Sequence, residues 1–344
     1  MFKVLRRLLG KNQSQREHKT PAVQQAPTEI VVEGMPILVL TEYLEWHNGF
    51  PIPDWSAIES WLEAAADEST RNTAWTACER AWLLYFAAAL GDGYRLAESE
   101  NAMVLSFAEP RFVQNTLNFM ERTLKRVSGV LNGLAEIPPY GKDILILFED
   151  QDDYYRYKFY YYPDSGEFAH SSGVYLNAGC GHFVTMRESD LALLEPTIVH
   201  EMTHACLSHL SLPRWIDEGL AVNVEERLTR RGAPLRTPQE MHEKHRRFWG
   251  EAEIQEFWSG KLFYRPGDSN ELSYDLARIL VEQLARDWDQ FRQFAQAADW
   301  RDGGASAARE FLGISLGAWV ASMFEKENTK AFEPRETRKS KRRK

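Results

Sequence analysis

The stretch TIVHEMTHACLSHLSLPRWIDEGLAVNVEERL, residues 197–228, contains two histidines four positions apart, His200 and His204, with Glu201 beside the first. On a helix, residues four apart lie about 40° from each other, so both imidazoles would point the same way. The apolar residues share a separate arc, about 120° wide, that would face the core: Ile198, Val199, Met202, Cys206 and Leu210. The pattern predicts a helix that packs on one face and presents two histidines and a glutamate elsewhere.

The flanking residues predict where this helix ends and a second one begins. Pro196 suits a first helical position, and Ser211–Pro213 would end the helix. His209 falls within the apolar arc and is predicted to be a packed or capping histidine. The second helix presents Glu218 on one side, with Glu225 about 20° away. Its other side is apolar: Leu220, Ala221, Val224 and Leu228.

Two histidine nitrogens and one glutamate oxygen form a donor set that is common in catalytic zinc sites, where a fourth position stays open. His200, His204 and Glu218 offer such a set, and we expect one Zn²⁺ per chain there. Taken alone, Glu218 would be assigned to a solvated helix face. The two histidines that precede it favour the ligand role.

The spacing HEMTH–x13–E, with the glutamate inside PRWIDEGLA, resembles the peptidase MA-like gluzincins. These metallopeptidases share the thermolysin and aminopeptidase N type of site. The resemblance spans roughly residues 94–325 and is specific only around residues 173–226 and 272–281.

The resemblance implies a zincin-like fold and a set of roles for the residues of the motif. His200, His204 and Glu218 would be the zinc ligands, and Glu201 would be the general base that activates a zinc-bound water. In the family an edge strand before the HExxH helix lines the substrate cleft. The matching segment here is Ser171–Met186.

Tyr274, in NELSYDLARILVEQLARDW, resembles the tyrosine of the family's Ser-Tyr pair at the start of a later helix. The resemblance implies that its hydroxyl is a second donor to the oxyanion. The alternative is an amphipathic core tyrosine. The same helix is predicted to bury a stripe of its own: Ala277, Leu280, Val281, Leu284 and Trp288.

One position departs from the family pattern. After EGLA the family often continues with an acidic residue, and here that residue is Val222. A carboxylate at this position would orient a ligand histidine, and losing such a partner commonly costs about 10–100-fold in metal affinity. Glu225 and Asn223 are the candidates to replace it.

The other histidines are predicted to have lesser roles. His242 and His245, in MHEKHRRFW, lack a paired carboxylate in the sequence and are predicted to lie on a solvated helix face. His170 and His182 flank the expected edge strand, and His182 is an outside candidate for a place in the cleft. The tyrosine-rich stretch YYRYKFYYYP is predicted to pack rather than to bind a ligand.

The rest of the chain indicates an α+β fold with a small mixed sheet. Residues 36–90 are predicted to be helical, because PDWSAIESWLEAAADE has a Pro-Asp start and NTAWTACERAWLLYFAAAL repeats apolar residues at helical spacing. YRLAESENAMVLSF predicts a strand pair, and KDILILFED predicts a buried strand before the HEMTH helix. We expect a basic N-terminus and linker over residues 1–34, a helical region over 35–92, a zincin-like metallopeptidase domain over 93–328 and a basic tail over 329–344.

Charge is unevenly distributed along the chain. Its net charge is −9, with +5 in residues 1–20 and +6 in residues 335–344, which leaves −20 for residues 21–334. The acidic body argues against nucleic acid as the main partner. The basic ends are predicted to be solvated and disordered, and a weak peripheral contact with anionic membranes is the alternative.

Three features of the sequence predict the cellular compartment of the protein. The three cysteines are scattered, without CxxC spacing, which predicts a reducing compartment and no cysteine metal site. The N-terminus lacks the pattern of a signal peptide. No apolar run reaches the length of about 18 residues that a membrane span needs. We therefore expect a cytoplasmic protein.

Two classes of function fit these residues. The first is zinc-dependent hydrolysis of a polypeptide substrate, with Glu201 and Tyr274 as catalytic residues. The second is a catalytically weak or inactive zincin-fold binding or scaffolding protein, which Val222 and the missing export signal favour. The intact HExxH and Glu218 favour the first. A different zinc hydrolase on the same site stays open, because the site and not the fold decides function.

Overall fold

A five-stranded mixed sheet is at the centre of the N-terminal part of the molecule. The structure, a computed structural model, describes residues 25–162, 173–230 and 236–336. The strand order is β5-β6-β7-β9-β8, with parallel pairs in the middle and an antiparallel pair at each edge. The mixture of helices and a small sheet agrees with the predicted α+β class. The strands are β5 (Arg95–Glu98), β6 (Ala102–Ser106), β7 (Asp143–Phe148), β8 (Gly173–Ala178) and β9 (Cys180–Met186).

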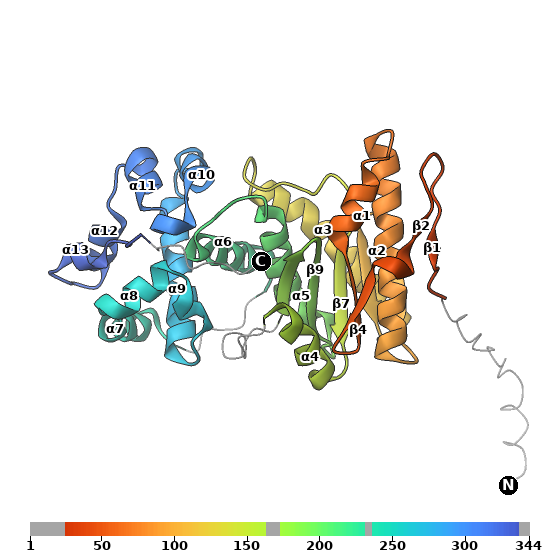
Figure 1. The fold of residues 1–344 in the computed structure, drawn as a ribbon. Coiled ribbons are helices and arrows are strands. Elements are labelled where there is room, and N and C mark those ends of the chain that lie inside the picture. The colour runs from red at the N-terminus through yellow and green to blue at the C-terminus, as the bar shows by residue number, and fades with distance from the viewer. Residues whose placement is uncertain (1–24, 163–172, 231–235, 337–344) are drawn as a thin grey trace, which may run out of the picture.

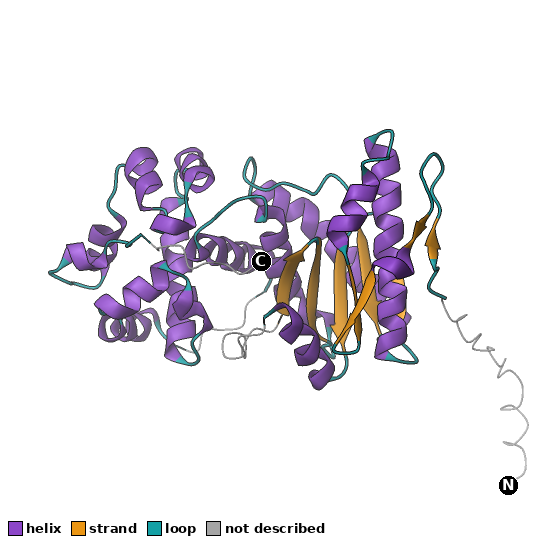
Figure 2. Ribbon diagram, viewed as in Figure 1, coloured by secondary structure: helices purple, strands orange, loops and turns teal. Residues whose placement is uncertain are grey.

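The central strand β7 explains why its sequence is an unbroken apolar run. Ile144, Ile146 and Phe148 face one core, and Leu145 and Leu147 face another. A strand that is covered on both faces needs apolar residues at every position. Figure 2 shows helices flanking the sheet. Those that contact it are α2 (Glu68–Leu90), α3 (Pro110–Val130), α4 (Gln151–Tyr161) and α5 (Leu191–Leu207).

The N-terminal region is only partly helical. Helix α1 (Trp55–Leu62) precedes α2, and η1 (Leu40–Tyr43) is a short 3-10 helix, but the prediction of helix is wrong for residues 38–39 and 44–53, where short strands form. Asn48 and Gly49 both have positive φ and join β3 to β4, and an Asn-Gly pair of this kind is a strong hairpin signal. The strands are β1 (Glu29–Ile30), β2 (Leu38–Val39), β3 (Leu44–His47) and β4 (Phe50–Pro53).

Several predicted boundaries shift. Strand β1 lies inside the predicted linker, where it pairs with β2. The predicted tail begins too early, because α13 (Thr329–Phe332) is ordered and Phe332 is buried. The N-terminal region shares one core with the sheet, in which Trp82 and Phe86 of α2 pack with Ile146 of β7. Residues 1–24, 163–172 and 337–344 lie outside the described residues, and so do most of the two basic ends.

The second half of the chain is helical. Helix α6 (Arg214–Leu228) packs between α5 and α9 (Asp268–Leu284). Figure 1 shows the later helices beside the sheet, beyond α6. Within the described residues, no helix has the length and apolarity to cross a bilayer. The remaining elements are α7 (Pro238–Phe248), α8 (Glu251–Trp258), η2 (Lys261–Tyr264), α10 (Trp288–Ala297), η3 (Trp300–Asp302), α11 (Ala305–Ala307), η4 (Ala308–Leu312) and α12 (Leu316–Met323).

Helix α5 begins earlier than Pro196 predicts. Asp190 caps it by accepting a hydrogen bond from the backbone N–H of Ala192, and Pro196 lies inside the helix. The prediction that Pro196 is the first helical residue is therefore wrong. The helix ends at Leu207, so His209 lies beyond it and is exposed, 3.6 Å from Glu136.

The strand-like segment before α5 is a hairpin rather than one strand. Gly179, with φ +86°, joins β8 to β9. Of these two strands, only β8 is at an edge of the sheet. His182 of β9 is fully buried on the face away from α5. It bonds to Tyr157 at 2.8 Å, and burial lowers its pKa to about 4. The prediction that His182 is a candidate for a place in the cleft is wrong.

Close packing of α6 on α9 gives a testable prediction. A Cβ on Gly219 would lie 2.5 Å from the backbone oxygen of Ala277. Gly219→Ala should lower the free energy of unfolding by about 1–3 kcal/mol, because overpacking forces the helices apart. Gly129→Ala is the matched control, since Gly129 lies in α3 with no atom near its Cβ position. That variant should be unchanged or more stable by about 0.5–1 kcal/mol. Equal denaturation midpoints for the two variants would contradict the packing argument.

Candidate metal centre

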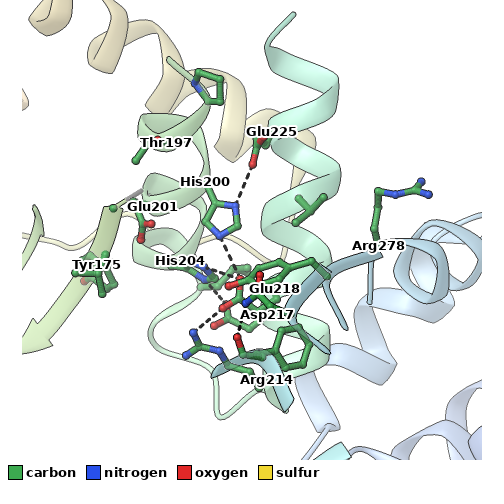
Figure 3. A pocket seen from close by; sticks show the side chains of 18 of the residues that line it. Tyr175, Thr197, His200, Glu201, His204, Arg214, Asp217, Glu218, Glu225 and Arg278 are labelled. Atoms are coloured by element: carbon green, nitrogen blue, oxygen red, sulfur yellow. Dashed lines mark hydrogen bonds and ion pairs between the residues drawn. The ribbon is translucent and has the colours of Figure 1, made fainter. Parts of the chain in front are cut away.

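Three side chains from two consecutive helices converge at one point. His200 and His204 project from α5, and Glu218 projects from α6. His200 Nε2 lies 3.2 Å from Glu218 Oε2, and His204 Nε2 lies 3.5 Å from the same oxygen. All the candidate ligand atoms lie within 4.8 Å of one another. Figure 3 shows the imidazoles and the carboxylate turned toward each other. The structure thus brings together the three residues that the sequence predicts as metal ligands.

The outer nitrogen of each imidazole faces a carboxylate. His200 Nδ1 lies 3.2 Å from Glu225 Oε2, and His204 Nδ1 lies 2.9 Å from Asp217 Oδ1. Ionised carboxylates only accept hydrogen bonds, so each Nδ1 is the N–H donor and Nε2 is turned toward Glu218. Histidines that bind metals usually donate their other ring N–H in this way.

Charge within the cluster favours a cation between the donor atoms. Burial lowers the pKa of His200, but hydrogen bonds with Glu218 and Glu225 outweigh burial and raise the pKa to about 9. Burial likewise opposes the charge on His204, whereas Asp217 and Glu218 raise its pKa well above its ordinary value. Protons on the imidazoles or a metal ion can supply the positive charge. The donor set of two nitrogens and one oxygen fits zinc.

Glu225 provides the carboxylate that the family pattern would place at position 222, where this chain has valine. Glu225, one turn further along α6, provides the carboxylate that orients His200. Asn223, the other candidate, is turned away, because its side-chain amide donates to the backbone oxygens of Gly219 and Arg278.

Asp217 is a site residue that the sequence prediction missed. Its carboxylate orients His204, although it directly precedes Glu218 in the sequence. Neighbours on a helix point about 100° apart, so helical periodicity assigns Asp217 to a different face. Its position beside a candidate ligand is the one signal that could have drawn attention to it.

Glu201 lies beside the ligands but does not join them. It is 7% exposed and borders the cleft. Burial raises the pKa of Glu201, and the backbone N–H of Tyr175 on β8, which is directed at the carboxylate, acts to lower it. Figure 3 shows Glu201 on the side of the histidines that faces β8. The carboxylate therefore lies next to the candidate ligands and close to the sheet edge.

Tyr274 borders the same cleft from α9. Its ring centre lies 6.4 Å from that of His200 and packs against Phe263. Burial and the charge of Glu218 raise its pKa well above the ordinary value, so the hydroxyl keeps its proton and can donate it. The prediction that Tyr274 opens its helix is wrong, because α9 begins at Asp268. The predicted stripe also divides, since Trp288 starts the next helix.

A cleft of about 780 Å³ opens at the donor atoms. The edge strand β8 forms one wall, and α5, α6, η2 and α9 form the others. Residues of both polar and apolar character face it. Examples are Asn177, Leu212, Arg214, Phe263 and Tyr264. The candidate ligands are therefore open to a molecule that is longer than a single residue.

The prediction for His245 is wrong. It is 2% exposed, its Nε2 lies 2.9 Å from Asp275, and its Nδ1 accepts the indole N–H of Trp249 at 2.7 Å. An indole is only a donor, so Nδ1 lacks a proton and Nε2–H donates to the carboxylate. The pair joins α7 to α9 and has a structural role. His242 is exposed, as predicted, and His170 lies outside the described residues.

Comparison with known proteins does not extend this picture, since no family model and no curated protein matches the chain. The likeness to the gluzincins therefore depends on the site itself, that is on residues 200–204 and Glu218.

The outer carboxylates give a second prediction. Glu225→Ala and Asp217→Ala should each weaken zinc binding by about 10–100-fold, because the imidazoles lose the partners that orient them. Glu243→Ala is the control, since Glu243 is exposed on α7 and pairs with Arg247. The measurement is competitive titration of the zinc-loaded protein with a chromophoric chelator. Unchanged affinity in both site variants would show that the carboxylates do not support the ligands.

Proposed function

We propose that the protein is a zinc-dependent hydrolase of peptide bonds, with a zincin-like fold and a site of the gluzincin type. The supporting observation is the convergence of His200 Nε2, His204 Nε2 and Glu218 Oε2 at the floor of a cleft. Glu201 lies beside these atoms but is not one of the candidate ligands. This combination provides a ligand set, a proton acceptor and room for a substrate.

The positions of the side chains suggest a separate chemical role for each of them. A bound zinc ion would supply Lewis acidity and lower the pKa of water to about 7. His200, His204 and Glu218 would hold the ion. Glu201 would accept a proton from the attacking water and pass it to the nitrogen of the leaving amine. The backbone N–H of Tyr175 is directed at the Glu201 carboxylate and favours its ionised form, which is the form that accepts a proton.

Strand β8 supports a polypeptide as the substrate. Among the described residues, β8 pairs with β9 on one side only, so within that part of the chain its other side is an edge of the sheet. In an antiparallel pair, alternate residues turn their backbone groups away from the partner strand. Because Tyr175 turns its N–H toward Glu201, Gly173 and Asn177 also present backbone groups to the cleft. An extended peptide can add to such an edge through main-chain hydrogen bonds.

The scaffolding alternative loses one of its two supports. The sequence favoured it because Val222 replaces an acidic residue. In the structure the carboxylate of Glu225 lies 3.2 Å from His200 Nδ1. His200 therefore has a carboxylate partner although position 222 is valine.

Glu201→Gln tests the enzymatic proposal. Glutamine keeps the size of the side chain but cannot accept the proton, so hydrolysis should fall by about 10²–10⁴-fold while zinc content stays unchanged. Glu218→Gln is the matched comparison, since it removes a ligand charge and should weaken zinc binding itself. The assay is mass spectrometry of new termini in peptides from a digested proteome. Equal cleavage by wild type and Glu201→Gln, or no cleavage by a zinc-loaded wild type, would contradict the proposal.

Tyr274→Phe tests the role of the hydroxyl in the cleft. If this hydroxyl stabilises the oxyanion, kcat should fall by about 10²–10³-fold with zinc content and KM close to wild type. Tyr140→Phe is the control, because its hydroxyl faces the exposed Glu59 on the other side of the sheet. A raised KM with unchanged kcat would instead assign Tyr274 to substrate binding.

A further inference from the structure

Arg214 is the one described arginine of the cleft that pairs with a candidate metal ligand. Its guanidinium lies 2.6 Å from Glu218 Oε1, on the oxygen that does not face the histidines. The other described arginines of the cleft pair elsewhere, Arg236 with Glu271 and Arg278 with Asp275. The two oxygens of Glu218 are therefore divided between a fixed cation and the two imidazoles.

The η2 turn holds Arg214 in this position. The ring of Tyr264 lies 4.9 Å from the guanidinium carbon, within the range of a cation–π contact. Gly260 approaches the base of the same side chain, and a Cβ there would lie 2.8 Å from Arg214 Cβ. Gly260 has φ +78°, a conformation that favours glycine. The backbone turn and the tyrosine ring together restrict where the guanidinium can lie.

Helix stability does not account for Arg214. It is the first residue of α6, where the helix dipole disfavours a positive charge. Its pairing with Glu218 also runs from arginine to glutamate along the helix, which is the less favourable order for an i, i+4 pair. The contact with Glu218 is therefore better explained by the site than by the helix.

We propose that Arg214 is a positioning residue that makes Glu218 a ligand through one oxygen only. This inference rests on the proposed zinc site. A carboxylate with both oxygens free can bind a metal through one or both. A charge-assisted hydrogen bond to Oε1 holds that oxygen away, and such bonds are roughly twice as strong as neutral ones. With one oxygen from Glu218 and one nitrogen from each histidine, the chain would supply three ligand atoms, and a zinc ion that takes four ligands would keep one position for water or substrate.

Cobalt substitution measures this effect without an activity assay. Co²⁺ has stronger visible absorption bands when it is four-coordinate than when it has five or six ligands. In the Co²⁺-loaded protein, Arg214→Ala should lose band intensity, because Glu218 becomes free to bind through both oxygens. Arg265→Ala is the matched control, since Arg265 follows the same turn but pairs with Glu256, and its spectrum should equal that of wild type.

Two further measurements keep the test sharp. Arg214→Lys keeps the charge but not the planar fork, so its spectrum should lie between those of wild type and Arg214→Ala. Added guanidinium ion should restore intensity to Arg214→Ala at concentrations that leave wild type unchanged. Identical spectra for wild type, Arg214→Ala and Arg214→Lys would overturn the role of Arg214 and leave the zinc proposal intact. A wild type that binds neither Co²⁺ nor zinc would overturn both.

Discussion

The site depends on keeping one buried carboxylate, that of Glu218, charged and fixed. Its side chain is 1% exposed, and an unpaired charge at such a place costs several kcal/mol. Burial would raise the pKa of Glu218, but Arg214 and His204 hold it well below its ordinary range. The dependence is mutual, because both imidazoles and the guanidinium face the same carboxylate. Removing Glu218 would leave three groups without their shared partner.

The fold serves this carboxylate by placing it between rigid elements. Helix α6 lies between α5, which bears the histidines, and α9, which lines the cleft. The short distance between α6 and α9 requires glycine at position 219, next to the carboxylate itself. Donor groups on packed helices keep their geometry better than groups on loops. The sheet contributes its edge strand β8, so the ligands and this strand border one cleft.

The sequence predicted the centre of the site because the residues are close together in the chain. Helical periodicity alone separates His200 and His204 from the packed face. The third candidate ligand, Glu218, follows His200 by only 18 residues. The same reasoning found Glu225, which lies on the same side of its helix as Glu218. For Tyr274 the sequence offered a resemblance and no periodic signal, and the structure places its ring near His200.

One error arises because a partner that is distant in sequence overrides a local pattern. His245 was assigned to a solvated face, but Asp275, 30 residues later, pairs with it in the interior. The segment before α1 contains an Asn-Gly turn, yet the helical prediction that comes from the apolar residues of α2 extends across it. Pro196 is tolerated inside α5, although local propensity assigns it to a helix start.

Zinc stoichiometry tests the central claim most directly. The purified full-length chain should be stripped with a chelator, equilibrated with zinc, passed through a desalting column and analysed by inductively coupled plasma mass spectrometry. The account predicts about one zinc per chain for the wild type and a large loss for His200→Ala and for His204→Ala. A folded wild type that remains free of zinc, or histidine variants that retain a full equivalent, would contradict it.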